Sequence, residues 1–355
     1  MAAGRRTTLG DLAEGLGLSA NTVSRALSGK DGVSERTRSL VLAEARRTGY
    51  LPAEDVTRRS TSSRRPDGAL SSTIAVTIPS ATHVFSSELI GAIEAGARSA
   101  GYSLDVFTTE ESAEVEQQIA DMIIDHDLAG AIVIPVQGRS EPWASVAASG
   151  RPVVAASREV PGLDCDFVTA DNGAGAYAAV RHLLAQGCRR IVQFEEDLAI
   201  STINHRREGF ARAMAEQPDA VAHTILVPTR RYETSEPRWR ATEAHRACLT
   251  FLDQPRDVTF DAIVTGDDYF ALGALAALRE RDISVPDQVR LVGYGDHPYS
   301  AWLDPPLTSI RIPTQLIGEL AVSLLLQRIA GDSGPGVRRM IKPELIIRRS
   351  SVPSP

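Results

Sequence analysis

The stretch LSANTVSRALSG (residues 18–29) decides how the first part of the chain folds. Val23, Ala26 and Leu27 recur at the spacing of one helix face, which predicts a short amphipathic helix. Ser19 stands where helix caps are preferred, and the closing glycine stands where a helix ends. The other face carries small polar side chains and one cation, so it suits contact with a negatively charged surface.

Two more helical patterns flank this segment. Residues 8–17 begin with Thr8 as a candidate cap, residues 34–49 begin with Ser34, and each pattern ends at a glycine. Three short helices with a tight turn between the first two are the outline of a helix-turn-helix unit.

The charge of the chain is unevenly distributed. The 355 residues have a formal net charge of −7, yet residues 1–65 contain 12 Lys and Arg against 7 Asp and Glu. A basic segment in an acidic protein indicates a polyanionic partner, although a solvated basic terminus has the same composition.

A helix that enters the major groove of DNA needs small or polar residues in its first turn and a side chain that reaches a base edge. Asn21 is suited to pair with adenine and Arg25 with guanine. The hydroxyls of Ser19, Thr22 and Ser24 suit phosphate oxygens. The alternative is a packed helical hairpin with a solvated polar face.

The rest of the chain alternates strands and helices. Residues 51–72 are rich in Ser, Thr, Arg and Pro and are predicted to be a hinge or linker. Continuous apolar runs then predict eight buried parallel strands, at 73–79, 103–109, 130–136, 153–157, 190–196, 223–228, 261–266 and 289–295. With helical segments between them, these strands predict two doubly wound α/β units.

Composition excludes several classes of protein. The three cysteines and seven histidines form no ligand spacing, so we expect neither a metal site nor a cofactor. The first 15 residues lack the apolar segment of a secretory signal, and no apolar run is long enough to span a membrane. We therefore expect a cytoplasmic protein without a membrane partner.

Residues 8–52 closely resemble the headpiece of LacI-family transcriptional regulators. The matching motif residues are Thr8, Asp11, Leu12 and Ala13, the run from Leu18 to Arg25, Val33, Ser34, Thr37 and Arg38, and finally Gly49, Tyr50 and Pro52. The segments GDDYFALGAL, ISVPDQVRLVGYGD and DPPLTSIRIP resemble the core of the same family, which is similar to periplasmic sugar-binding proteins.

The resemblance implies a multidomain chain. An all-α helix-turn-helix headpiece (1–50) and a hinge (51–72) would precede a two-lobed α/β core with parallel sheets (73–355) that binds an effector and dimerises. Lobe one would comprise about 73–171 and 311–337, and lobe two about 172–310 and 338–352.

The resemblance also assigns roles to residues of the headpiece and hinge. The base-reading positions are Ala20, Asn21 and Arg25, and the phosphate contacts are Thr8, Ser19, Thr22, Ser24, Ser34 and Thr37. Val56 and Arg59 are the hinge residues expected at the minor groove. The family's hinge asparagine is Ala53 here and its wedge leucine is Arg59, so we do not expect the usual strong kink.

For the cleft between the lobes, the resemblance implies an effector site built from Phe85, Ser86, Arg206, Tyr232, Asp267 and Asp296. An aromatic ring with arginine and carboxylate groups suits a sugar or a sugar derivative. Taken singly, Phe85 is equally compatible with a core position and Arg206 with a surface ion pair. The family's sugar-binding aspartate slot is Gly295 here.

One alternative is an enzyme. Gly173-x-Gly175-x-x-Ala178 opens a helix after a strand, and Glu195 and Glu196 follow about 20 residues on. This spacing imitates a dinucleotide fingerprint and hence an NAD-dependent oxidoreductase. A sugar-binding protein without DNA contact is a third hypothesis.

We favour a transcriptional regulator, a repressor of carbohydrate-related genes, over an enzyme. A homodimer would place two recognition helices on a palindromic operator in double-stranded DNA. A small molecule that binds two arrangements of the lobes differently would control DNA binding allosterically.

Overall fold

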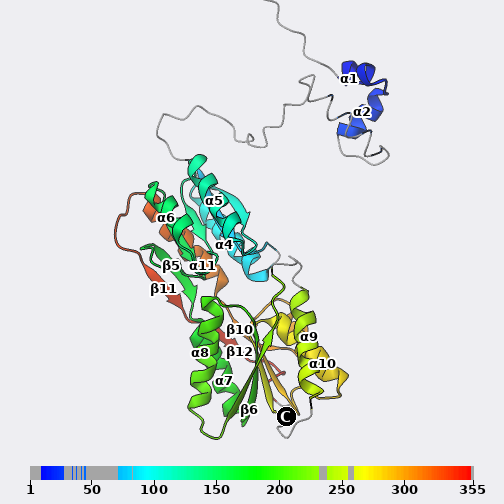
Figure 1. Cartoon of the computed structure of the whole chain (residues 1–355), viewed down its shortest axis with the longest axis vertical. Coiled ribbons are helices and arrows are strands. Elements are labelled where there is room, and N and C mark those ends of the chain that lie inside the picture. Colours follow the sequence, from blue (N-terminus) through cyan, green and yellow to red (C-terminus); the bar gives the residue numbers. More distant parts are fainter. Residues whose placement is uncertain are drawn as a thin grey trace, which may run out of the picture. The chain divides into compact units, whose positions relative to one another are not determined.

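The computed structural model divides into two compact units, residues 1–69 and 70–355 (Figure 1). It describes residues 9–27, 34, 37, 41, 44, 71–81, 83–231, 238–254 and 260–352. Within these residues, no helix combines the length and the apolarity needed to cross a membrane.

The first unit contains the expected helix pair, α1 (Leu9–Leu16) and α2 (Ala20–Leu27). Gly17, at a φ of 63°, ends α1, and the backbone N–H of Leu18 donates to the carbonyl of Ala13 (3.0 Å). The apolar faces of the helices meet in a small core formed by Leu12, Ala13, Val23, Ala26 and Val41. The predicted helix-turn-helix outline is confirmed.

A serine cap starts α2. The hydroxyl of Ser19 accepts a hydrogen bond from the backbone N–H of Thr22 (3.1 Å) and also contacts the hydroxyl of Thr22 (2.8 Å). Ser34 and Thr37 repeat both contacts, at 3.2 and 2.8 Å. Caps of this kind are each worth about 1 kcal/mol.

The second unit contains two six-stranded sheets, which define lobe one and lobe two. In spatial order, the strands of lobe one are β11 (Arg338–Ile341), β5 (Asp166–Ala170), β4 (Val153–Ala156), β3 (Ala131–Val133), β1 (Thr73–Ile78) and β2 (Ser103–Thr108). Those of lobe two are β12 (Glu344–Ile346), β10 (Thr308–Arg311), β9 (Arg290–Gly295), β8 (Ala262–Thr265), β6 (Arg190–Glu196) and β7 (Val221–Val227). Neighbouring strands are parallel except β10 and β12, which pair antiparallel.

Helices cover both faces of each sheet (Figure 1). In lobe one, α4 (Val84–Ser99) and α11 (Thr314–Ile329) cover one face, and α5 (Ala113–Asp125) and α6 (Glu141–Ala148) the other. In lobe two, α7 (Asn172–Ala185) and α8 (Ser201–Ala215) lie opposite α9 (Trp239–Leu252) and α10 (Asp268–Glu280), and a short 3-10 helix, η1, spans Ser300–Trp302. The expected two-lobed α/β core is confirmed.

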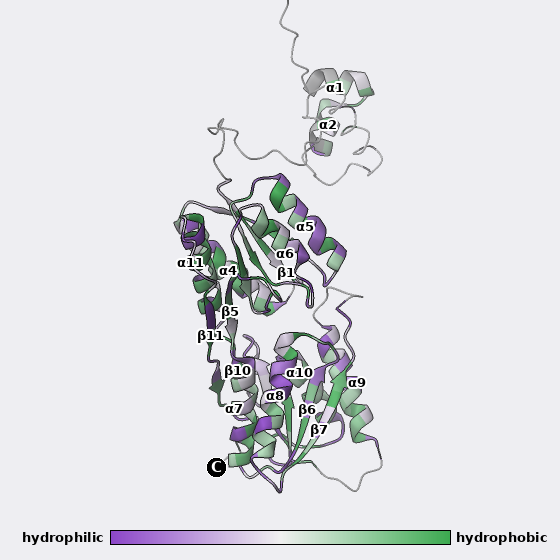
Figure 2. Ribbon diagram, turned by 60° about the vertical axis from the view of Figure 1, so that its left-hand side comes forward, coloured by the Kyte–Doolittle hydropathy of each residue, from purple (hydrophilic) through white to green (hydrophobic). Residues whose placement is uncertain are grey.

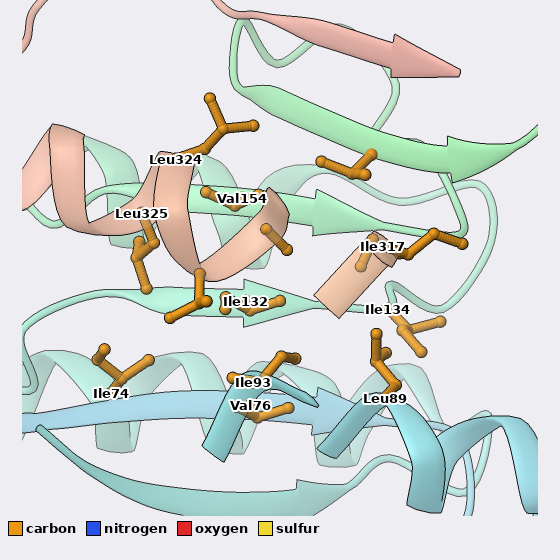
Figure 3. Close-up of a cluster of buried hydrophobic side chains, with 14 of the residues drawn as sticks. Ile74, Val76, Leu89, Ile93, Ile132, Ile134, Val154, Ile317, Leu324 and Leu325 are labelled. Atoms are coloured by element: carbon orange, nitrogen blue, oxygen red, sulfur yellow. The ribbon is translucent and has the colours of Figure 1, made fainter. Parts of the chain in front are cut away.

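The inner strands of each sheet are apolar because both of their faces are buried, whereas the edge strands β2, β7, β11 and β12 are largely exposed. Figure 3 shows Ile74, Val76 and Ile132 of the first sheet packed under Leu89 and Ile93 of α4. In Figure 2 the strands are mostly green, whereas the surrounding helices carry purple and green stretches, as amphipathic helices do.

The chain passes between the lobes three times, after β5, after β10 and after β11. β11 pairs with β5 along residues 338–341, so the last passage follows Ile341. The boundary expected at residue 337 therefore differs from the structure, because the short run RRMI adds an edge strand to lobe one before the chain returns to lobe two.

Close packing of α8 on α7 gives a test of this arrangement. A Cβ at Gly209 would overlap the backbone of Gly173, so Gly209→Ala is expected to lower the free energy of unfolding by about 1–3 kcal/mol. Gly91→Ala is the control, because its Cβ would enter open space within α4 and alanine favours the helix. Urea unfolding followed by circular dichroism measures both; equal stability of the two variants would contradict the packing.

Candidate functional site

The exposed face of α2 is the first candidate surface. Ala20 and Arg25 are exposed, whereas Val23 and Ala26 are buried against α1. A small side chain at the helix start and a guanidinium about one turn later therefore share the side turned away from the core. Of the other predicted DNA contacts, Thr8 and the side chains of Asn21 and Ser24 lie outside the described residues.

A cleft between the lobes is the second candidate site. It lies at the carboxyl ends of the strands, where ligands bind in open α/β sheets. Lobe one contributes Pro79, Ile134 and Ser157, which follow β1, β3 and β4. Lobe two contributes Gly266, which follows β8, and Gly295, which ends β9. The first turns of α4 and α8 also line the cleft, and neither helix has a side-chain cap.

Three arginines line this cleft, and each is held by its own carboxylate. The pairs are bidentate, with N···O distances of 2.6–2.9 Å: Arg158 with Glu111, Arg206 with Glu195, and Arg231 with Glu196. The carboxylate side chains are between 1% and 5% exposed. Removal of one partner would leave a buried charge uncompensated, which typically costs about 3–5 kcal/mol.

Glu196 shows the strength of these pairs. Burial opposes its ionisation, but the charge and hydrogen bonds of Arg231, together with the charge of Arg240 and the hydroxyl of Thr229, lower its pKa to about 2. Burial likewise opposes the charge of Arg206, but Glu195 outweighs burial and raises the pKa of the guanidinium. Glu196 and Arg206 are therefore both charged at neutral pH.

Arg206 projects from α8 and is held from two sides. Its guanidinium carbon lies 5.1 Å from the ring centroid of Tyr294, which is a cation–π geometry. The carboxylate of Glu195 fits because residue 266 is glycine, and a Cβ there would overlap the carboxylate. The ion pair therefore depends on the absence of a side chain at Gly266.

Polar contacts also join the lobes across the cleft. The backbone N–H of Ser201 donates to Gln137 (3.0 Å), Arg231 lies 3.6 Å from Glu111, and His83 lies 3.7 Å from Asp267. Glu111 therefore faces two arginines, one from each lobe. A change in the angle between the lobes must alter these contacts.

The structure brings together several of the residues expected at the effector site. Phe85, Ser86 and Arg206 line the cleft. Asp267 caps α10 by accepting from the backbone N–H of Tyr269 (2.7 Å), and its carboxylate is next to the cleft residue His83. Phe85 also packs against the core of lobe one, so the two hypotheses for this residue are compatible.

Two expected residues are not part of this group. Asp296 turns to the ion pairs with Arg311 (2.7 Å) and Arg348 (2.6 Å) and lines a separate pocket beside α4 and α11. Asp296 has a positive φ of 51° and, unlike its neighbours Gly295 and His297, is not among the cleft-lining residues. Tyr232 lies outside the described residues.

The sequence analysis missed the other charged groups of the cleft, Glu111, Arg158 and Arg231, and also His83 and His297. A usable signal was the pair Glu195–Glu196, because two carboxylates at the end of an apolar strand need cationic partners. In the sequence, both carboxylates also belong to the spacing that imitates a dinucleotide fingerprint.

The structure does not support that fingerprint. β5 belongs to lobe one, whereas α7, which carries Gly173 and Gly175, packs in lobe two. The motif therefore does not join a strand and helix of one βαβ unit, as dinucleotide binding requires. Among the described residues, no cluster of His, Cys, Asp and Glu is arranged to hold a metal ion.

Comparison with known proteins agrees with this architecture. Residues 8–53 match the model of bacterial regulatory proteins of the lacI family, and residues 180–351 match a periplasmic binding protein-like domain. The HTH-type transcriptional repressor CytR of Escherichia coli K12 is 30% identical over 350 residues, which are 97% of this chain and 96% of CytR.

Two solved structures share the fold of nearly the whole chain. The lac repressor dimer bound to operator and the anti-inducer ONPF superposes with a TM-score of 0.70 at 24% identity, covering 98% of this chain and all of that one. The transcriptional regulator CelR in complex with cellobiose gives a TM-score of 0.67 at 24% identity, covering 97% of this chain and all of CelR.

A helix-turn-helix unit followed by a two-lobed core of the periplasmic-binding type defines a DNA-binding transcriptional regulator. This chain belongs to the lacI family of bacterial regulatory proteins. Its relatives regulate transcription, so the oxidoreductase alternative is wrong and the chain is not an enzyme.

The pKa of Glu196 leads to a prediction for stability. Its folded value of about 2 lies below the ordinary 4.5, so its stabilising contribution is complete above pH 4.5 and is lost as the pH falls towards 2. Glu196→Gln is expected to lower the free energy of unfolding at pH 7 by about 3 kcal/mol, and by less below pH 4.5.

Urea unfolding at several pH values between 7 and 3.5 measures this difference. Asp253→Asn is the control, because its pair with Arg281 is solvent-exposed and contributes little. If the difference in free energy of unfolding between wild type and Glu196→Gln does not change with pH, the buried ion pair of Glu196 is contradicted.

Proposed function

We propose that this regulator is a repressor that binds a palindromic DNA operator as a homodimer. The observation that carries the proposal is the face of α2, where Ala20 and Arg25 are exposed beside the cap formed by Ser19 and Thr22. A recognition helix places such residues at base edges, while hydroxyls near the helix start contact phosphates.

The individual contacts are assigned from the resemblance of residues 8–52 to the headpiece of the family. Ala20, Asn21 and Arg25 read bases, and Thr8, Ser19, Thr22, Ser24, Ser34 and Thr37 bind phosphates. Ser19 and Ser34 share the same cap geometry, which supports a similar role for the two sites. Val56 and Arg59 remain predictions for the minor groove.

A homodimer follows from the size of one recognition surface. A single short helix reads too few base pairs for a unique site, whereas two helices related by a two-fold axis read a palindrome. The fold shared with the dimeric lac repressor supports this arrangement. Such a protein acts on the chromosome, and in a bacterium this places it in the cytoplasm.

We further propose that a sugar or sugar derivative binds in the cleft and controls DNA binding, most directly for carbohydrate-related genes. Phe85 offers a ring for sugar C–H faces, and Ser86 and Arg206 offer hydrogen-bonding groups for hydroxyls. The related fold that binds cellobiose supports this ligand class. Asp267 is a further candidate at the edge of the same group.

Arg25→Ala tests the reading of bases. We expect it to reduce discrimination at one base pair of the operator by about 1–3 kcal/mol, because one bidentate contact is lost. Selection from a randomised oligonucleotide pool defines the operator, and fluorescence anisotropy then measures single-base variants. Arg281→Ala removes the same charge from lobe two and should leave discrimination unchanged. Equal losses on all sequences would show that Arg25 contacts only the backbone.

A paired substitution tests the effector site. Arg206→Met combined with Glu195→Gln removes both charges of one buried pair, so that neither is left uncompensated. We expect this variant to bind operator DNA but to lose its response to sugars. The matched control, Arg281→Met combined with Asp253→Asn, removes a solvent-exposed pair and should keep the response. Fluorescence anisotropy with and without sugar measures the response. If the response is unaltered, Arg206 is not part of the effector site.

A further inference from the structure

Two histidines from opposite lobes face each other in the cleft. His83 precedes α4 in lobe one, and His297 follows β9 in lobe two. Their rings are nearly perpendicular, with centroids 6.3 Å apart. The Nε2 atoms lie 3.7 and 3.9 Å from the carboxylate of Asp267, beyond hydrogen-bond distance.

The Nε2 atom of the His297 imidazole needs a hydrogen-bond partner. Its side chain is 5% exposed and lines the cleft, and among the described residues its Nε2 has no hydrogen-bond partner. A buried polar atom without a partner costs free energy, so such an atom facing a cleft indicates a ligand that completes it.

The backbone holds His297 in this position. Its N–H donates to Asp268 (2.7 Å), which also accepts from the hydroxyls of Ser300 (2.7 Å) and Ser309 (2.6 Å). The ring lies over residue 295, where a Cβ would come within 2.8 Å of it. Gly295 also has a φ of 127°, which other residues rarely adopt. Glycine at this position therefore admits the imidazole to the cleft.

The charges around the cleft balance. The three guanidinium groups that line it each pair with a carboxylate, Arg158 with Glu111, Arg206 with Glu195 and Arg231 with Glu196, and nearby Arg240 lies 3.8 Å from Asp267. Burial and the nearby charges of Arg240 and Arg231 lower the pKa of His83 well below its ordinary value, so His83 adds no charge at neutral pH. A dianionic ligand would enter without a compensating cation.

We infer that His83 and His297 form a ligand subsite for hydroxyl groups, and that the cleft selects an uncharged polyhydroxylated ligand over its phosphorylated form. A neutral imidazole offers one donor and one acceptor, as a hydroxyl does, whereas a phosphate dianion only accepts. The uncapped starts of α4 and α8 donate N–H groups to ligand oxygens, and their dipoles favour an anion and so oppose this selection. This inference rests on the sugar effector proposed above.

Matched pairs of ligands test the inference on the full-length protein. Glucose, ribose and cellobiose are compared with glucose 6-phosphate, ribose 5-phosphate and cellobiose 6′-phosphate by thermal shift and isothermal titration calorimetry. In any pair that binds, the neutral member is expected to bind at least about 100-fold more tightly, because the phosphate dianion would be buried without a compensating cation.

Tighter binding of a phosphorylated member would overturn the inference but leave the sugar effector intact. Binding of no member of any pair would contradict the proposed effector itself, and the inference with it. The two failures are therefore distinguishable.

Substitution of the imidazole tests its part in the subsite. His297→Phe keeps a ring over Gly295 and removes Nε2, so affinity for the neutral sugar is expected to fall about tenfold. His245→Phe is the control, because His245 pairs with Glu280 on the outside of lobe two. If His297→Phe leaves the affinity for the neutral sugar unchanged, His297 is not part of the subsite.

Discussion

The pairing of buried arginines with buried carboxylates is the constraint on which the core depends. Two parallel sheets direct their carboxyl ends at one cleft, and polar groups gathered there are removed from water. Each guanidinium in the cleft is neutralised by a bidentate partner at 2.6–2.9 Å, so burial does not leave a charge uncompensated. The cleft is consequently polar and highly charged in composition, yet neutral in sum.

One of these carboxylates also makes a contact between the lobes. Glu111 faces Arg158 within lobe one and Arg231 across the cleft, so the second contact depends on the angle between the lobes. Three chain passages allow the lobes to change that angle. A ligand shifts such an equilibrium only to the extent that it binds one arrangement better than the other. Contacts from both lobes, such as those of His83 and His297, provide that difference.

Much of the fold was predictable because it rests on local patterns. Val23 and Ala26 mark the buried face of α2, and continuous apolar runs marked eight strands, all of which the structure contains. The eight runs leave out β5, β10, β11 and β12. The last three are only three or four residues long, and their sequences TSIR, RRMI and ELI carry weak periodicity. The polar cleft was harder to predict, because the pairing of Arg231 with Glu196 depends on tertiary structure. His297 enters the cleft only because of the conformation of Gly295.

The most direct test of the account measures operator affinity as a function of cleft occupancy. The full-length protein is titrated onto a palindrome enriched from a randomised pool, at fixed ionic strength, with and without a neutral sugar that raises its melting temperature. The account predicts that the sugar changes the dissociation constant at least about fivefold, in either direction. No enriched palindrome, or equal affinity with and without the bound sugar, would contradict it.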